Sequence, residues 1–414
     1  MSEADVIVVG AGPAGASTAA HLATHGRHVL LLDKAHFPRE KVCGDGLTPR
    51  AVRELDLLGV DHSTWQRNVG LRIYAHRPYP YLLRWPDLRD FPPVGCVRRR
   101  ADFDQTLADH AVARGADFRP GVTVTGPLLD DHGRVVGVTT KDGRQFHAPV
   151  TVAADGNSAR LALALGLQRR ASRPLGVAVR AYYTSPRHDE DWLESWLELW
   201  DGQPGRSHLL PGYGWIFPAG DGTCNVGLGL ESTSPAFGHT DYRALLRRWL
   251  ATTPEEWGFR DACQVGPIGS AALPMGFHRP PEYRPGLVLV GDAAGLVSPF
   301  NGEGISYALE SGRHAARHIA AALAAGVGTR PAERALEAYP AALRSAWGRH
   351  FRLGNLFLEL IGRPEIMKLA SHYLLPLPGV AQLVHRTLAN LVDDPPSNVY
   401  DRIVHLLRSL VPSA

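Results

Sequence analysis

A glycine-rich hexapeptide near the N-terminus constrains the fold of this chain more than any other feature. Residues 10–15 read GAGPAG, follow an apolar run at 4–9 and open a helical stretch that ends at Gly26. A second apolar run, 28–32, ends in Asp33. The glycines allow a tight turn and close approach to a pyrophosphate, the helix N-terminus offers amide donors, and the acid accepts hydrogen bonds from a ribose. This order of segments predicts a dinucleotide-binding β-α-β unit.

Composition narrows the class of protein. The chain has 414 residues, which is enough for roughly two to three structural units. A net charge of +3 without a long basic run argues against nucleic-acid binding. The four cysteines lie far apart and form no C-x-x-C pair, which disfavours a disulfide framework or a metal site and indicates a reducing compartment.

Targeting signals and membrane spans are not visible in the sequence. No signal peptide precedes the first predicted strand, and no apolar run reaches the ~18–20 residues of a transmembrane helix. We therefore expect a cytoplasmic protein. Residues 351–392 combine apolar stripes with Arg, Lys and His. This pattern fits either helices that contact the inner face of the cell membrane transiently or a helical cap on the rest of the protein.

The central part of the chain changes to strand patterns. Within 121–154, the segments VTVTGPLL, VVGVTT and QFHAPVTVAAD are separated by the turns DDHG and KDGR, which predicts a three-stranded meander. Residues 175–275 alternate as an antiparallel sheet does. A buried strand at 287–290 precedes a helix at about 304–325, and the remainder, about 330–410, is predicted to be helical.

The segment after the buried strand resembles a motif of FAD-dependent oxidoreductases of the p-hydroxybenzoate-hydroxylase type. VLVGDAAGLVSPFNGEGI (288–305) is similar to their second fingerprint. The resemblance implies that Asp292 binds the ribityl chain and that the amides of Gly304 and Ile305 face the pyrimidine edge of the flavin.

Two more segments resemble the same superfamily. VRRRADFDQTL is similar to its R-x-x-F-D segment, which implies that Arg100 lies near the pyrophosphate, and VAADG is similar to its D-G motif. The implied cofactor is FAD. No second G-x-G-x-x-G unit is present for a nicotinamide, so the electron donor stays open between NADPH, ferredoxin, a quinol-linked donor and a partner protein. The implied FAD contacts are Gly10, Gly12, Pro13, Ala14, Gly15, Asp33, Lys34, Cys43, Gly44, Asp45, Arg100, Val124, Asp155, Gly156, Asp292, Gly302, Gly304 and Ile305.

The expected architecture is α/β: a discontinuous FAD-binding Rossmann-type domain of the p-hydroxybenzoate-hydroxylase type, an antiparallel-sheet substrate domain and a C-terminal helical region. The predicted boundaries are 1–75, 95–170 and 280–328 for the FAD-binding domain, 76–94 and 171–279 for the substrate domain, and 329–414 for the helices.

Two motifs point to a family within this superfamily. CGDGLTPRAV begins at Cys43, and LPGYGWIFP ends at Pro218 and is followed by NVGLGL. Both resemble the geranylgeranyl reductase family, which reduces isolated prenyl C=C bonds. The segments EWGF, LPMG and NGEGI add a resemblance to its actinobacterial menaquinone reductases. The resemblance implies an FAD-dependent reductase that saturates C=C bonds of an isoprenoid lipid, in particular one double bond of the menaquinone tail, by hydride transfer from reduced flavin.

The family pattern also implies roles for individual residues. The loop from Cys43 would run along the flavin, and Tyr213, Trp215, Phe217 and Pro218 would form the wall of the substrate cavity. Cys43, Tyr213 and Trp215 are the candidate catalytic residues. The residues alone leave alternatives open: the three alternating aromatic side chains also fit a plain core, and Cys43 also fits as a small buried residue. The alkene proton could come from Tyr213 or from an ordered water.

Two alternatives to this interpretation were considered, another flavoenzyme activity and a metal site. A flavin-dependent monooxygenase or halogenase acting on an aromatic or natural-product substrate would share the FAD motifs. Halogenases of the tryptophan type carry W-x-W-x-I-P, whereas Tyr213 and Phe217 replace two of those positions here. His314 and His318 stand four apart on a predicted helix without a third metal ligand, and we predict a solvated helix face there.

Overall fold

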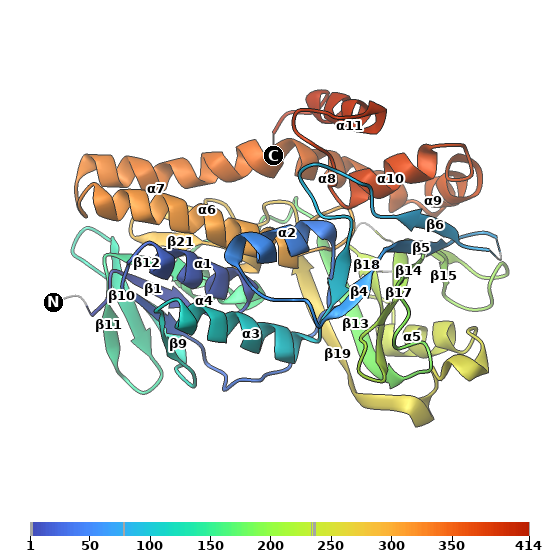
Figure 1. Ribbon diagram of the computed structural model, residues 1–414, viewed down its shortest axis with the longest axis horizontal. Coiled ribbons are helices and arrows are strands. Elements are labelled where there is room, and N and C mark those ends of the chain that lie inside the picture. Colours follow the sequence, from blue (N-terminus) through green and yellow to red (C-terminus); the bar gives the residue numbers. More distant parts are fainter. Residues whose placement is uncertain (1–2, 78, 233, 235–236, 414) are drawn as a thin grey trace.

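The structure is a computed structural model that describes residues 3–77, 79–232, 234 and 237–413. Figure 1 shows an elongated molecule with a helix-covered sheet at one end and a second sheet at the other. The C-terminal helices run along one side of both. The chain is therefore built from two sheet layers joined side by side, with a helical layer over them.

The N-terminal fingerprint forms the centre of the first sheet. β1 (Val6–Val9) pairs in parallel with β2 (Val29–Leu32) and with β12 (Val150–Ala153). The strand order is β20-β21-β12-β1-β2-β8, with β8 (Asp117–Arg119), β20 (Tyr283–Arg284) and β21 (Leu287–Leu289). Every residue of β1, β2 and β12 is buried, as expected for parallel strands covered on both faces.

Helices from distant parts of the sequence pack together beside this sheet. α1 (Pro13–Thr24) packs against α3 (Arg100–Ala113) and against α6 (Ile305–Ala324), and α7 (Arg330–Leu343) packs on α6. The predicted helix at about 304–325 is thus confirmed within a residue at each end.

The predicted solvated face at His314 and His318 is wrong. Both residues are half-buried. The His318 ring nitrogen Nδ1 lies 2.9 Å from the carbonyl oxygen of Ala335 in α7, and the His314 ring packs edge-on against Trp347. The residues after 330 fold back over α6 and cover this face.

The predicted three-stranded meander is confirmed, but its third segment is divided into two strands. β9 (Val124–Leu129), β10 (Val135–Thr140) and β11 (Gln145–His147) pair in sequence. The third segment does not continue as one strand, because Pro149 has no amide hydrogen to donate and separates β11 from β12. The buried run of β12 then crosses to the first sheet.

The second sheet has the order β19-β13-β18-β17-β14-β5-β6. Its pairs are antiparallel except that of β14 with β5. The strands are β5 (Gly70–Tyr74), β6 (Tyr81–Arg84), β13 (Leu175–Thr184), β14 (Leu193–Trp196), β17 (Gly212–Pro218), β18 (Thr223–Glu231) and β19 (Gln264–Pro274). β5 lies within the segment 1–75 predicted for the first domain, yet it pairs with β14 and β6 of the second sheet. The hairpin from residue 70 therefore belongs to the second sheet.

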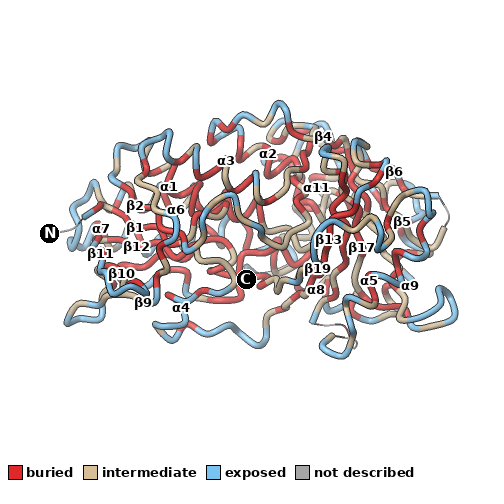
Figure 2. Tube along the Cα trace, turned by 90° about the horizontal axis from the view of Figure 1, so that it is seen from below, coloured by how far each residue is buried: buried red, intermediate tan, exposed pale blue. Residues whose placement is uncertain are grey.

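The remaining strands and helices up to residue 293 are mostly short. They are β3 (Gly46–Leu47), β4 (Gln66–Asn68), β7 (Gly95–Val97), β15 (Leu199–Trp200), β16 (Leu209–Leu210), α2 (Pro49–Leu58), α4 (Arg160–Ala164), α5 (Tyr242–Leu250) and the 3-10 turns Gly156–Ser158, Glu255–Trp257, Asp261–Cys263 and Gly291–Ala293. Figure 2 shows that buried residues follow the strands of both sheets, whereas the turns of the β9–β11 meander are exposed.

The C-terminal region is helical, as predicted. It contains α8 (Arg349–Ile361), α9 (Pro364–Leu369), α10 (Val380–Leu388), α11 (Val399–Ser409) and the π-helical segments Arg344–Gly348 and Ala370–Leu374. Leu375 and Ala381 pack against Ile73, Tyr81 and Leu83 of the β5–β6 hairpin. These helices thus cover the far end of the second sheet, and among the described residues no helix has the length and apolar character needed to cross a bilayer.

Candidate active site

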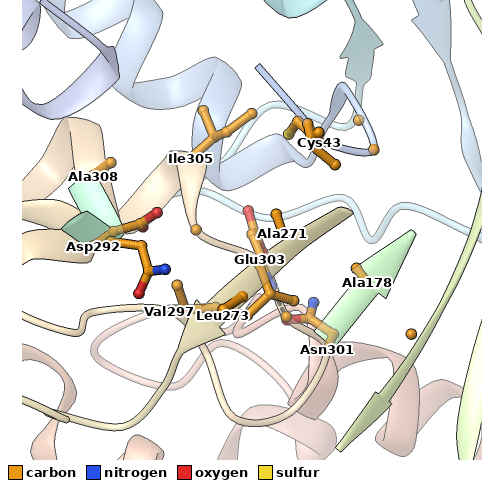
Figure 3. Close-up of a pocket in the computed structure, with 18 of the residues that line it drawn as sticks. Cys43, Ala178, Ala271, Leu273, Asp292, Val297, Asn301, Glu303, Ile305 and Ala308 are labelled. Carbon is orange, nitrogen blue, oxygen red and sulfur yellow. Dashed lines mark hydrogen bonds between the residues drawn. The ribbon is translucent and has the colours of Figure 1, made fainter. Parts of the chain in front are cut away.

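One cavity of about 920 Å³ runs between the two sheets and under the C-terminal helices. This volume is at the upper end of the range for ligand sites, ~300–1,000 Å³. Figure 3 shows the side chains that surround it: Cys43 from the loop after β2, Ala178, Ala271 and Leu273 from the second sheet, and Asp292 and Ile305 from the segment around the start of α6. The cavity is therefore shared by segments far apart in sequence.

Most residues predicted from the sequence line this single cavity. They are Gly10, Gly12, Pro13, Ala14, Asp33, Lys34, Cys43, Gly44, Asp45, Arg100, Val124, Asp155, Gly156, Tyr213, Trp215, Phe217, Asp292, Gly302, Gly304 and Ile305. Two predicted residues are not part of the lining. Gly15 is buried beneath the loop, and Pro218 is buried at the end of β17, where it pairs with Cys224. Phe217, the neighbour of Pro218 on β17, lines the cavity instead.

Two glycines of the loop leave no space for side chains. Gly10 has φ +103°, and a Cβ atom there would lie 2.3 Å from the carbonyl oxygen of Ala154. A Cβ atom on Gly15 would lie 1.8 Å from the carbonyl oxygen of Gly10. Gly15 therefore acts by letting α1 pack closely on the loop, while Gly12 stays open toward the cavity, with nothing nearer to its Cβ position than an Arg39 nitrogen at 3.5 Å.

The entrance to α1 suits an anionic group. Gly12 caps the helix without a side-chain hydrogen bond, so its first amides remain available. Arg100 is fixed beside it by a bidentate pair with Asp104, at 2.8 Å for both contacts. Asp33 at the end of β2 accepts hydrogen bonds from the amides of Ala11 and Ala35, at 2.8 and 2.9 Å. This set matches the pyrophosphate and ribose of a dinucleotide.

The continuation of the cavity suits the flavin end of FAD. Asp155 and Asp292 both line it, and burial raises the pKa of each carboxyl. Asp155 Oδ1 is buried without a hydrogen-bond partner, which is expected of an acceptor whose donor belongs to a ligand. Gly304 caps α6 without a side chain, so the first amides of that helix also face the cavity. These residues fit FAD.

The Cys43–Asp45 loop is fixed to the second sheet by hydrogen bonds. The Asn225 amide nitrogen donates to the Cys43 carbonyl at 2.8 Å and to Asp45 Oδ2 at 2.7 Å, and the Tyr182 hydroxyl donates to the same oxygen at 2.5 Å. Asp45 is fully buried and adopts φ 65°, a left-handed conformation that Asp tolerates better than most residues. Burial raises the pKa of Asp45 to about 6, although the Tyr182 and Asn225 hydrogen bonds oppose the rise.

Cys43 is a thiol without a disulfide partner. Its Sγ accepts a weak hydrogen bond from the Asp45 amide at 3.4 Å. Burial raises the pKa of the thiol, although the Arg100 charge opposes the rise. The thiol is therefore held protonated in the wall of the cavity.

The aromatic stripe of β17 faces the cavity with all three side chains. The Trp215 indole donates to Asn225 Oδ1 at 3.0 Å, and the Tyr213 hydroxyl donates to the Asn301 carbonyl at 2.6 Å. Gly227, opposite Trp215, leaves room for that ring, because a Cβ atom there would lie 2.3 Å from it. The indole plane is thus fixed by one hydrogen bond and one glycine.

The other end of the cavity is apolar. Helices α8, α9 and α10 and the segment between them close it from one side, and β5 and β14 with the residues after it close it from the other. The lining there includes Leu71, Ile73, Leu193, Leu197, Phe357, Leu358, Ile361, Met367, Leu374, Leu375, Val384 and Leu388. The cavity thus continues from the FAD-binding loops into a long apolar channel.

Sequence reasoning missed several polar residues of the site. Asn225 and Glu231 lie on β18, Arg180 and Tyr182 on β13, and Glu303 precedes α6. Arg180, Glu231 and Glu303 line the cavity, and Asn225 and Tyr182 contact the Cys43–Asp45 loop. A signal was present in the alternation N-x-G-x-G-x-E of β18, which puts the two polar residues and two glycines on one face.

Comparison with known proteins agrees with this geometry. Residues 3–342 match the FAD binding domain family. The chain is 36% identical over 397 residues to the menaquinone reductase of Mycolicibacterium smegmatis, covering 95% of this chain and 93% of that protein. It is 30% identical over 382 residues to the digeranylgeranylglycerophospholipid reductase of Methanocella arvoryzae, covering 90% and 91%.

A solved structure shows the same fold. The geranylgeranyl bacteriochlorophyll reductase-like protein of Thermoplasma acidophilum superposes with a TM-score of 0.78 at 24% identity, over 98% of this chain and 99% of that one. The predicted α/β architecture of the p-hydroxybenzoate-hydroxylase type and the cofactor FAD are confirmed. The chain belongs to the geranylgeranyl reductase family of FAD-dependent oxidoreductases.

Proposed function

We propose that this protein saturates C=C bonds of an isoprenoid chain, and that its substrate is a menaquinone of whose tail it reduces one double bond. The observation that carries the proposal is the continuity of the cavity from the FAD-binding loops into the apolar channel under α8–α10. A prenyl tail needs such a channel, whereas a small aromatic substrate does not. The similarity to menaquinone reductases over nearly the whole chain favours a quinone headgroup.

The protein's part in the reaction is orientation and exclusion of water. Bound FAD, once reduced, supplies a hydride for one alkene carbon. Trp215, fixed by Asn225, and Phe217, packed against Gly44 and Gly46, form a rigid wall against which a prenyl unit can lie. Holding the double bond in a reactive position can lower the barrier by as much as ~7–11 kcal/mol in ideal cases. Asp45 and Asn225 keep the Cys43 loop in place during this step.

The mouth of the apolar channel is suited to contact with a membrane. Four apolar side chains from 48% to 68% exposed lie together on α9, the π-helical segment after it and the turn that follows: Leu369, Tyr373, Leu374 and Leu377. Leu374 also lines the cavity, so we place the mouth of the channel here. Exposed apolar side chains around a channel opening favour transient docking on the inner face of the cell membrane, where the substrate is dissolved. Electrons come from an external donor.

Vesicle binding tests the membrane contact. Leu377→Ser removes an apolar side chain at the mouth, and Leu129→Ser is a matched control because both leucines are 50% exposed and Leu129 lies on the meander at the opposite end of the molecule. Burying a leucine is worth roughly 1.5–3 kcal/mol, so we expect Leu377→Ser to weaken vesicle binding about tenfold or more. Equal binding of both variants would exclude the mouth as the docking surface.

The proposed activity is tested by an anaerobic single turnover. The purified FAD-loaded protein is reduced with dithionite and mixed with a menaquinone that carries a fully unsaturated tail, and the product is weighed by mass spectrometry. We expect a gain of two hydrogens confined to the tail. If the protein reduces no prenyl substrate and instead hydroxylates or halogenates an aromatic compound in the presence of oxygen, it is a monooxygenase or halogenase.

A variant of the channel links the activity to this cavity. Val384→Trp places a large side chain in the channel lining on α10, and Val399→Trp makes the same change at an exposed position of α11. We expect Val384→Trp to keep its FAD and to lose reduction of long-tailed menaquinone, while Val399→Trp behaves as the unaltered protein. Full activity of Val384→Trp on long tails would show that the tail binds elsewhere.

A further inference from the structure

Glu231 is a carboxyl group in the cavity that neither the FAD fit nor the substrate channel explains. It is the last residue of β18, opposite Gly176 on β13. A Cβ atom built on Gly176 would lie 3.1 and 3.3 Å from the two carboxyl oxygens, so the carboxyl group lies over the space that this glycine leaves. The register of β13 and β18 thus places Gly176, which has no side chain, beside Glu231, and this leaves room for the carboxyl group in the cavity wall.

The carboxyl group lies near the loop that precedes α6. The methyl group of Met275 is 2.9 Å from the Cβ position of Gly176 and 3.9 Å from that of Gly302. The Tyr213 hydroxyl is 3.7 Å from the same Gly302 position. Glu231 and Gly302 therefore share Met275 as a neighbour, at the end of the cavity where Gly304 and Ile305 offer their amides.

Glu231 carries its proton at neutral pH. Its Oε2 is buried and has no hydrogen-bond partner. Burial alone raises the pKa of the carboxyl to about 8. Among the described residues, the titratable groups that face it are Tyr213 on β17 and Tyr242 on α5, neither of which is a cation that would favour the ionised form. A neutral carboxylic acid in an apolar cavity is a proton donor without a task in binding FAD.

The other acids in the cavity are less suited to donate a proton. The Tyr213 hydroxyl already donates to the Asn301 carbonyl, and burial raises the pKa of that phenol. Burial raises the pKa of Glu303, but the hydrogen bond that its Oε1 accepts from the Thr48 hydroxyl at 2.6 Å and the charge of Arg50 oppose the rise. Burial also raises the pKa of the Cys43 thiol. Among the described acids of the cavity, Glu231 is the carboxyl with an unpaired oxygen whose raised pKa is opposed by no hydrogen bond and no cation.

We propose that Glu231 is the catalytic acid of alkene reduction: its carboxyl proton is delivered to one carbon of the prenyl double bond while the other carbon receives the hydride. The π bond breaks, two C–H bonds form, the reduced flavin is oxidised by two electrons, and the Glu231 carboxylate regains a proton from water after product release. This assignment rests on the proposed function.

The test compares Glu231→Gln with Glu337→Gln in the FAD-loaded protein. Glutamine keeps the size of the side chain and cannot donate the proton, and Glu337 is exposed on α7. General acids contribute typically ~10²–10⁴-fold to rate, so we expect single-turnover oxidation of the reduced flavin by menaquinone to slow by ~10²-fold or more in Glu231→Gln. Glu337→Gln is expected to match the unaltered protein, and Tyr213→Phe to lose less than tenfold.

A second readout does not depend on activity. Infrared spectra of the unaltered holoprotein are expected to contain a protonated-carboxyl band at pH 6 that is lost as the pH rises through about 8. The part of the band that titrates near pH 8 is expected to be absent in Glu231→Gln and present in Glu337→Gln. Binding of a menaquinone with a saturated tail, followed by the flavin absorbance, is expected to be equal in all variants.

The outcomes separate the two proposals. If the unaltered protein reduces no prenyl chain, the proposed function fails and the role of Glu231 fails with it. If the unaltered protein is active and Glu231→Gln reacts at the same rate, only the acid assignment fails. Should Glu231→Gln not retain FAD, the infrared titration of the unaltered protein decides, because a Glu231 carboxyl that is already ionised at pH 6 overturns the assignment.

Discussion

The buried Asp45 makes the stability of this protein depend on pH in a way that a single substitution can remove. Its pKa rises from an ordinary 3.8 to about 6 in the folded protein. The folded state therefore holds this proton more tightly than the unfolded chain does, so stability is full below pH ~4 and falls until the pH passes about 6. At about 1.4 kcal/mol per unit, the whole loss is roughly 3 kcal/mol, of which about half occurs between pH 5 and 7.5.

Asp45→Asn should abolish this dependence. Asn fits the left-handed backbone, and its carbonyl oxygen can still accept from Tyr182 and Asn225 in place of Oδ2. The new amide nitrogen replaces Oδ1, which has no partner, and this costs about 1 kcal/mol at every pH. The free energy of unfolding of Asp45→Asn relative to the unaltered protein should therefore increase by about 1.4 kcal/mol from pH 5 to 7.5.

Urea unfolding at saturating FAD measures this difference. The measurement is made at several pH values and repeated at a second FAD concentration, so that altered cofactor affinity is recognised. Asp131→Asn, at an exposed position of the β9–β10 turn, is the control and should show no pH-dependent difference. Parallel pH curves for Asp45→Asn and the unaltered protein would refute the reasoning, because they would mean that Asp45 is ionised in the folded protein as readily as in the unfolded chain.

Two further substitutions test the close approaches around the cavity. Gly15→Ala should abolish FAD retention, because the new Cβ would lie 1.8 Å from the Gly10 carbonyl oxygen. FAD retention is measured by flavin absorbance after gel filtration. Gly126→Ala is the control and should retain FAD, because its Cβ would lie 3.6 Å from the nearest atom. Gly227→Ala should retain FAD but slow single-turnover reduction of menaquinone at least tenfold, since its Cβ would lie 2.3 Å from the Trp215 ring and would displace it. A fully active Gly227→Ala would show that the position of the indole does not matter.

Local sequence patterns were sufficient to predict the parts of the fold that a few adjacent residues determine. The glycine positions and Asp33 predicted β1, α1 and β2, because a phosphate-binding turn demands glycine at fixed spacing whatever surrounds it. The alternation of Tyr213, Trp215 and Phe217 predicted one shared face, and all three line the cavity.

Features set by pairing between distant segments were not predictable in the same way. Nothing local shows that the hairpin from Gly70 joins the second sheet, because its partner β14 lies more than a hundred residues away. Likewise, the role of Asn225 appears only when β18 is aligned with β17 and the Cys43 loop lies above them. Glu231 looks like an ordinary strand-end carboxylate until its neighbour across the sheet is known to be Gly176.

One face of β18 links the two ends of the site. Asn225 fixes the Cys43 loop and the Trp215 indole, Gly227 and Gly229 leave space beside Trp215 and Tyr213, and Glu231 follows at the far end. At about 3.4 Å per residue, these six steps span ~20 Å. The strand thus joins an anchoring amide, a surface without side chains and a neutral acid in one line. Gly227 leaves room for the Trp215 ring, and Gly229 lines the cavity itself, which explains why a residue type that weakens strands occurs twice in the middle of this one.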